Sequence, residues 1–279
     1  MAEQAEVYYK RAIQLDDQLP VVHIILGRLY SGSDKQLALQ EFQRALKLQP
    51  HNADALLGLA GVYESMERPQ DAERLYQEAV ALRPNNWDGH YQLANFYFHQ
   101  RHNDKAAGEW RRVVTITPDN ARAHSSLGVA LQELGRLDES EAELKESLAL
   151  QPTYPAYAML GRLYCQQKRW AEAAAMGEEA AKRNQTDYRV WAMLGPVYEW
   201  LNRKDKADKA YREELVRLEE AVKLNREDAA LQSDLGQLYS KLRLREKAIT
   251  TIQSALAPLP LPSGSCLPPS RSSSLSGSH

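Results

Sequence analysis

One short phrase recurs along this chain at a fixed interval and constrains the fold more than any other feature. The segments ALKLQPHN, AVALRPNN, VVTITPDN and SLALQPTY place prolines at Pro50, Pro84, Pro118 and Pro152, each 34 residues after the previous one. A fixed period of this length indicates a stack of repeated units, each of which buries its apolar face against its neighbours. The chain is therefore expected to be a repeat array.

Each interval contains two stretches with the apolar period of an α-helix. The first stretch carries Leu followed by a small residue, and the small residues are Gly27, Ala60, Ala94, Gly128, Gly161, Gly195 and Gly236. The second stretch begins with its own small column, which holds Ala38, Ala72, Ala106, Ser140, Ala173, Ala207 and Ala248. Glycine inside a helix costs about 1 kcal/mol relative to alanine, so its use must be compensated. We expect close approach of two antiparallel helices at these columns.

The proline phrase is interpreted as the joint between one helical hairpin and the next. Proline just after the second helix prevents that helix from continuing. Asn52, Asn86 and Asn120 follow the prolines and can cap the next first helix.

This pattern resembles the tetratricopeptide repeat (TPR) family over roughly nine-tenths of the chain. The resemblance implies an all-α fold, a right-handed α-solenoid of stacked antiparallel helical hairpins whose first helices line a concave groove. The TPR superhelix is expected over residues 1–257, and a disordered Pro/Ser-rich tail over 258–279. The array is divided into a half repeat at 3–19 and units at 20–52, 53–86, 87–120, 121–153, 154–187, 188–228 and 229–262, the last running into the tail.

The sixth unit departs from the period. The expected seven-residue step from Ala207 reaches Glu214, and the small column returns only at Ala221. Seven additional residues make nearly two helical turns, so the apolar face stays almost in phase. We expect a second helix that is two turns longer in this unit. Pro196, inside the first helix of the same unit, is interpreted as a tolerated kink rather than a hinge.

Composition excludes several classes of partner. A net charge of −2 argues against nucleic acid, and no apolar run approaches the ~18 residues of a membrane span. The N-terminus lacks the basic start and apolar stretch of a signal peptide. Cys165 and Cys266 are two isolated cysteines, which suits a reducing compartment. These features favour a cytoplasmic protein that binds neither nucleic acid nor membrane.

Motifs for catalysis are absent from the sequence. It has no phosphate-binding Gly loop, no G-x-S-x-G and no C-x-x-C. His23, His90 and His124 share one repeat column, which indicates packing. His99 and His102 form an H-x-x-H without a further ligand in view. We expect no enzyme activity, no cofactor and no metal site.

Function is expected on the groove. Exposed aromatic residues and arginines are common anchors at protein interfaces. The candidate peptide-binding residues implied by the resemblance are Tyr91, Asn95, Phe98, Arg122, Arg162, Arg189, Met193 and Trp200. Two questions stay open. Tyr91 and Phe98 either bind a ligand or pack between first helices. The arginines either form a cationic stripe for an acidic ligand or are balanced by Glu133 and Glu199.

The leading hypothesis is a non-catalytic protein–protein interaction scaffold that binds a peptide segment of an unidentified partner protein. The alternative is a regulatory or oligomerising arm of a larger enzyme, such as a bacterial signalling kinase, which the half repeat and the uncapped last repeat favour. RNA binding is a third class, disfavoured by the net charge. The apolar face of Ile249 and Ile252 predicts weak end-to-end self-association.

Overall fold

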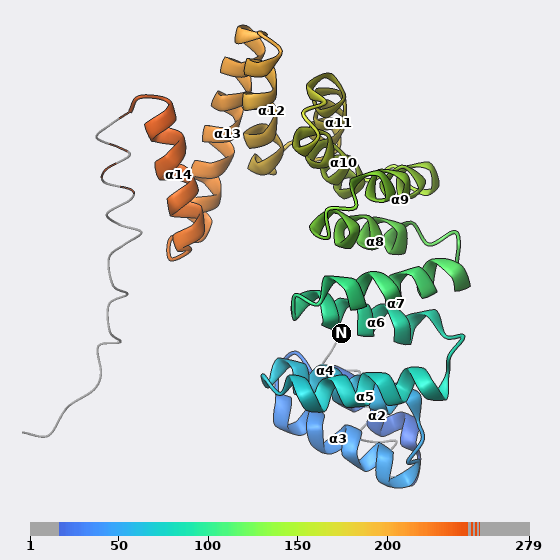
Figure 1. Cartoon of the computed structure of the whole chain (residues 1–279). Coiled ribbons are helices and arrows are strands. Elements are labelled where there is room, and N and C mark those ends of the chain that lie inside the picture. The colour runs from blue at the N-terminus through green and yellow to red at the C-terminus, as the bar shows by residue number, and fades with distance from the viewer. Residues whose placement is uncertain (1–16, 245–246, 248, 250, 252–279) are drawn as a thin grey trace, which may run out of the picture.

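A computed structural model describes residues 17–244, 247, 249 and 251. In this part of the chain the secondary structure consists of thirteen α-helices, and no strand occurs (Figure 1). The helices are α2 Pro20–Tyr30, α3 Lys35–Leu48, α4 Ala53–Ser65, α5 Pro69–Leu82, α6 Trp87–His99, α7 Asn103–Ile116, α8 Ala121–Glu133, α9 Leu137–Leu150, α10 Tyr154–Gln166, α11 Trp170–Arg183, α12 Tyr188–Trp200, α13 Lys204–Leu224 and α14 Ala229–Lys241. The predicted all-α class is confirmed.

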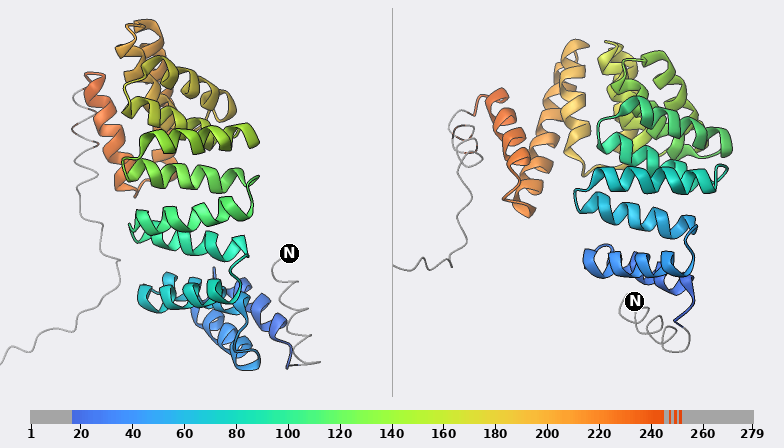
Figure 2. Two further views of the ribbon diagram at one scale, coloured as in Figure 1. Left: turned by 45° about the vertical axis from the view of Figure 1, so that its right-hand side comes forward. Right: turned by 60° about the horizontal axis from the view of Figure 1, so that its bottom comes forward.

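The helices pair into antiparallel hairpins that stack along one axis. Each even-numbered helix from α2 to α12 packs against the odd-numbered helix that follows it, and each odd-numbered helix packs against the next even-numbered one. The stack bends, so that α12 to α14 form an arm facing the earlier hairpins across an open space (Figures 1 and 2). We call the surface of the even-numbered helices the first-helix face and that of the odd-numbered helices the second-helix face.

The joints between hairpins follow the sequence signals. Helices α3, α5, α7 and α9 each end two residues before the recurring proline. The side chains of Asn52, Asn86 and Asn120 accept hydrogen bonds from backbone N–H groups in the first turn of α4, α6 and α8, each at 3.0 Å. The predicted asparagine caps are therefore confirmed. Aspartates cap three further helices in the same way, which the sequence reading missed: Asp34, Asp187 and Asp228.

The small residues of the first helices make room for large side chains from the second helices. A Cβ placed on Gly27 would lie 2.8 Å from the ring of Phe42. At these columns, the expected close approach therefore brings a large side chain of the second helix against the backbone of the first. At Gly128 two side chains of α9 lie close. A Cβ there would lie 2.7 Å from Leu144 Cγ, and Ser140 Oγ donates a 2.7 Å hydrogen bond to the Gly128 carbonyl oxygen.

The fifth hairpin fills the same space differently. Its second helix has Gly177 in the column that holds Phe42 and Leu144 in other units. Met193, from the first helix of the next hairpin, enters the space. A Cβ on Gly177 would lie 2.7 Å from Met193 Cε, and one on Gly161 would lie 3.0 Å from the same atom. Met193 thus joins two neighbouring hairpins.

Helix α13 has 21 residues, whereas α3, α5, α7, α9 and α11 each have 14. The prediction of two additional turns is confirmed. Leu218 is fully buried within this helix. Helix α12 runs without a break through Pro196, and its length of 13 residues equals that of α4 and α6.

Some predicted features lie outside the described residues. These are the helix of the half repeat at 3–15, the tail at 258–279 and most of the last second helix at 246–257. Residues 247, 249 and 251 of that helix are helical, and Ile249 is 47% exposed. The division into repeat units stays a prediction. Within the described part of the chain, every helix is too short or too polar to cross a bilayer.

Substitution of Gly128 tests the tight fit across the fourth hairpin. Gly128→Ala should lower the free energy of unfolding by about 1–3 kcal/mol, because its Cβ collides with Leu144, and Gly128→Leu should cost more. Urea melts give the comparison. Gly108→Ala is the matched control, since Gly108 lies in α7 with open space around its Cα. That change should stabilise by about 1 kcal/mol through helix propensity alone. Equal midpoints for the two Gly128 variants would contradict the packing described.

Candidate functional site

Open hollows occur along the first-helix face, and two of them collect six of the eight predicted site residues. The hollow between α6 and α8 has a volume of about 400 Å³, and the one between α10 and α12 about 240 Å³. The first contains Tyr91, Asn95 and Arg122. The second contains Arg162, Arg189 and Met193. The structure thus divides the predicted site into two places rather than one.

Aromatic rings form one wall of the hollow between α6 and α8. Trp87 is 41% exposed, and its ring meets Tyr91 edge-on with 6.3 Å between centroids. Tyr91 also packs against Trp110 of α7 at 6.5 Å, and its hydroxyl lies 3.4 Å from Ser126 Oγ of α8. Tyr91 therefore packs between helices and lines the hollow at the same time. Phe98 packs on Trp110 at 5.5 Å and lines neither hollow.

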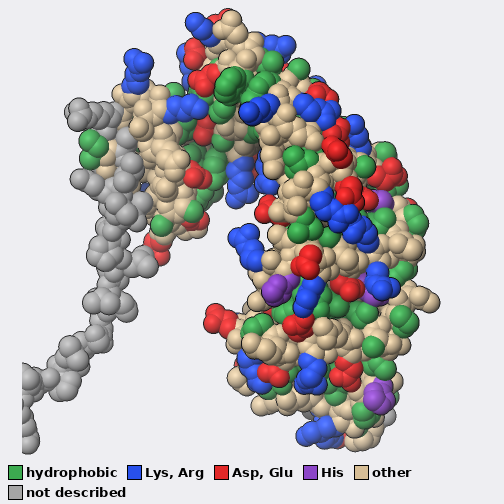
Figure 3. Space-filling model, viewed as in Figure 1, with side chains coloured by type: hydrophobic (Ala, Val, Ile, Leu, Met, Phe, Trp, Pro, Cys, Tyr) green, Lys and Arg blue, Asp and Glu red, His purple; other side chains and the backbone are tan. Residues whose placement is uncertain are grey.

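The three arginines are exposed and largely uncompensated. Among the described residues, no carboxylate lies within 4.0 Å of the Arg122 or Arg162 guanidinium. Arg189 lies 4.0 Å from Asp187, and its side chain is 75% exposed. Neither Glu133 nor Glu199 pairs with them in this part of the chain. The balance by Glu133 and Glu199 is therefore not observed in the described residues, whereas Asp88 and Asp187 line the same two hollows as the arginines. Side chains of both signs, Lys and Arg as well as Asp and Glu, lie on the walls of the open space facing the α12–α14 arm (Figure 3).

Trp200 lies apart from both hollows. Its ring stacks on that of Trp170, from the start of α11, with centroids 5.3 Å apart and planes 3° from parallel. Trp200 remains 69% exposed. The pair forms a flat aromatic surface beside the turns that connect first to second helices.

The histidine column connects the helices at three of the joints. His90 is buried, its Nδ1 lies 2.6 Å from Glu109 Oε2, and its Nε2 lies 2.9 Å from the Pro84 carbonyl oxygen. His124 repeats these contacts with Glu143 and Pro118, and His23 with Glu41 and Asp17. The packing role predicted for the column is confirmed. The glutamate partners were missed, although their constant spacing of 18 or 19 residues was readable.

His99 of the H-x-x-H pair has its Nδ1 2.9 Å from Glu64 Oε1. In the described part of the chain, no group of three or more His, Cys, Asp or Glu side chains is arranged to hold a metal ion. The Cys165 thiol is half-buried, and this burial raises its pKa.

Glu214 is a buried carboxyl group in the small column of α13. It is 9% exposed and lines a hollow between α12 and α14. Burial raises its pKa to about 7, against the opposing effect of Lys241, and Asp234 raises it further. Tyr211 on α13, and Tyr188 and Arg189 on α12, are further ionisable groups close by. The repeat pattern identified Glu214 as an unusual residue in a small-residue column, but it did not predict that the carboxyl group is buried.

Comparisons with known proteins agree with this architecture. Residues 28–86 and 62–120 match the family model of the tetratricopeptide repeat. Residues 110–219 match the middle TPR-like domain of cilia and flagella-associated protein 70. The chain is a tetratricopeptide repeat protein. The predicted family is confirmed.

Individual relatives extend the comparison. Cellulose synthase operon protein C of Xanthomonas axonopodis pv. citri (strain 306) is 36% identical over 72 residues, which cover 26% of this chain and 5% of that protein. The chain therefore spans a small part of this curated relative. The structure of PilF from Pseudomonas aeruginosa has a TM-score of 0.65 and 17% identity, covering 82% of this chain and 98% of PilF. YrrB, described as a TPR protein with an unusual peptide-binding site, has a TM-score of 0.54 and 22% identity, covering 65% and 94%. At these identities the structures show a shared fold.

The buried Glu214 carboxyl should make stability depend on pH. Its pKa is raised on folding, so the folded chain binds more protons between about pH 4.5 and pH 7, and stability falls as pH rises through this window. Glu214→Gln removes the buried charge and should stabilise at pH 8 by about 1–3 kcal/mol, with little gain at pH 4.5. Urea melts at both pH values measure this.

Glu213→Gln is the matched control, because Glu213 is paired with Arg217 at 3.2 Å on the same helix. It should give no gain at pH 8. A gain of equal size for both variants, or none for Glu214→Gln, would contradict a buried ionisable Glu214.

Proposed function

We propose that this chain is a non-catalytic scaffold that binds a peptide segment of a partner protein along its first-helix face. Proteins of the TPR fold generally act in protein–protein interaction, and their stacked hairpins offer extended concave surface rather than a deep pocket. The observation that carries the proposal is the pair of hollows that combine apolar side chains with exposed arginines. Such surfaces suit an acidic segment with interspersed apolar residues.

The two hollows have complementary tasks in this proposal. Trp87 and Tyr91 supply rigid aromatic surface, which binds at low cost in side-chain entropy. The Asn95 side-chain amide both donates and accepts, so it suits the backbone of an extended peptide. Arg122 lies in the same hollow and attracts a carboxylate.

The second hollow supplies further charge. Arg162 and Arg189 line it together with Met193, whose unbranched side chain adapts to varied apolar partners. The Arg122, Arg162 and Arg189 guanidinium groups therefore recur along the first-helix face from α8 to α12. An extended acidic peptide is the ligand whose charge spacing matches such a stripe. Because the surface is open and hydrated, we expect affinity in the micromolar class.

Phe98 and Trp200 lie outside both hollows and have supporting roles in this proposal. Phe98 supports Trp110, against which Tyr91 packs, so it positions the aromatic wall. Trp200 offers a separate contact beyond the stripe, through its stacked pair with Trp170. The description of YrrB as a peptide-binding TPR protein supports the proposal at the level of the fold.

Binding of acidic peptides tests the proposal. An array of acidic, neutral and basic peptides is probed with the intact chain, and the hits are titrated by calorimetry. Acidic peptides should bind preferentially. Arg122→Ala/Arg162→Ala/Arg189→Ala and Tyr91→Ala should each weaken binding about tenfold, since interface anchors contribute more than about 1 kcal/mol.

The matched control is Arg74→Ala/Arg112→Ala/Arg212→Ala, which removes three exposed arginines from the second-helix face. It should leave binding unchanged. Equal losses for the two triple variants would indicate a non-specific charge effect, and binding unaffected by Tyr91→Ala would place the ligand outside the aromatic hollow.

A further inference from the structure

A hollow of about 460 Å³ opens on the second-helix face, away from the proposed peptide stripe. Helices α11 and α13 form its walls, and α12 contributes Trp191, Leu194 and Tyr198. Neither the family pattern nor the groove residues account for it. Its origin is visible in the repeat columns.

Two small residues create the space. Ala181 of α11 occupies the column that holds Leu46, Val80, Val114 and Leu148 in the four preceding units. Those four side chains pack against the core. Ala210 of α13 occupies the column that holds Glu109 and Glu143 in the third and fourth units. Both alanines line the hollow, so two side chains are shortened at the same place.

The first helix has changed together with α13. Trp191 stands in the column of His90 and His124, and its Nε1–H donates to the Gln185 carbonyl oxygen at 3.4 Å. This hydrogen bond corresponds to those between His90 or His124 Nε2 and the loop carbonyl oxygens of Pro84 or Pro118. The contact to a glutamate has no counterpart, because Ala210 lacks a carboxylate. An apolar indole therefore faces space that a His–Glu pair fills elsewhere.

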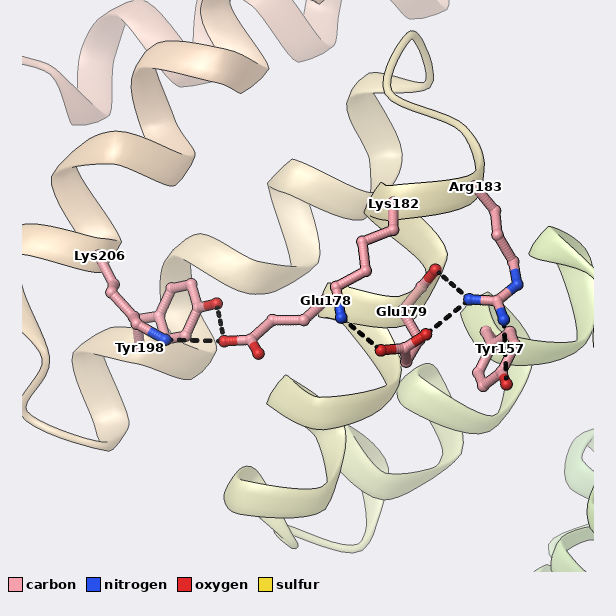
Figure 4. A network of polar contacts seen from close by, with 7 residues as sticks. All are labelled: Tyr157, Glu178, Glu179, Lys182, Arg183, Tyr198 and Lys206. Atoms are coloured by element: carbon pink, nitrogen blue, oxygen red, sulfur yellow. Dashed lines mark hydrogen bonds and ion pairs between the residues drawn. The ribbon is translucent and has the colours of Figure 1, made fainter.

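Basic side chains surround this apolar floor. Four cationic residues line the hollow against two carboxylates, Glu178 and Glu213; the cations are Lys182, Lys206, Lys209 and Arg217. Glu178 Oε1 already accepts from Lys206 Nζ at 2.9 Å and from the Tyr198 hydroxyl at 2.7 Å (Figure 4). Arg217 lies 3.2 Å from Glu213, and Lys182 Nζ lies 2.6 Å from Glu179 Oε1 just outside the hollow (Figure 4). Among the described residues, Lys209 has no ion-pair partner.

The geometry points to a second binding site for a protein partner. We propose that this hollow binds an acidic segment in which a bulky aliphatic side chain, such as leucine, is flanked by aspartate or glutamate. The aliphatic side chain lies against Trp191 and Leu194, in the volume left by Ala181 and Ala210. One flanking carboxylate lies near Lys209, and a second lies near Lys182, which it shares with Glu179. Charge complementarity and the apolar floor together select this class of ligand over a purely anionic one.

Filling the hollow is the direct test. The probe is the fluorescein-labelled synthetic peptide DEDLLEDE, titrated into the intact chain by fluorescence anisotropy. Ala181→Leu restores the large aliphatic residue of the preceding units. It should weaken binding at least about tenfold, because the new side chain fills the volume proposed for the aliphatic side chain of the ligand. The control is Ala175→Leu, at an exposed position of α11 outside the hollow, which should bind as the parent does.

A charge variant tests the site independently, in case Ala181→Leu disturbs folding. Lys209→Glu changes an exposed side chain and should weaken binding by about threefold or more, the effect of an exposed ion pair. Lys204→Glu, on α13 but outside the hollow, is its control and should have no such effect. Circular dichroism checks the fold of all four variants.

Several results would overturn the site. They are absence of peptide binding to the intact chain, equal binding of DEDSSEDE, displacement by inorganic phosphate alone, and binding lost through Tyr91→Ala but kept in Ala181→Leu. The last result would assign the peptide to the first-helix face and leave the function proposed above intact.

Discussion

Everything in this array depends on the fit between a small residue on one helix and a large side chain on its hairpin partner. Gly27 faces Phe42, and Gly128 faces Leu144. No unit can bury these side chains alone, so each hairpin needs its neighbours, and stability is distributed over many similar contacts. Departures from the fit are consequently local. Gly177 alters one hairpin and is compensated by Met193 from the next, without disturbing the rest of the stack.

The fold was readable from the sequence because its determinants are periodic. Proline spacing, small columns and asparagine caps each repeat, and the longer α13 followed from a broken step at Glu214. The candidate binding surfaces were only partly readable. Arg122 and Arg162 could be placed on the first-helix face, but their freedom from ion pairing depends on side chains from other units. The hollow beside Trp191 arises from two absent side chains on different helices, which no single column reveals.

The histidine column explains how regular units tolerate such variation. In three joints a histidine connects a loop carbonyl to a glutamate on the second helix, which fixes both sides of the hairpin with one side chain. Trp191 retains the carbonyl contact and gives up the glutamate. The Trp191 position therefore differs chemically from the three histidine positions, although α12 has the same length as α4 and α6.

The longer α13 also sets a spacing. Seven more residues at 1.5 Å each place the joint before α14 about 10 Å further along than a regular unit would. A ligand that contacts both α10 and α14 must cross this interval, whereas one confined to regular hairpins meets equal steps. A partner with evenly spaced contact points on the first-helix face would therefore meet α2 to α12 in register and lose register at α14.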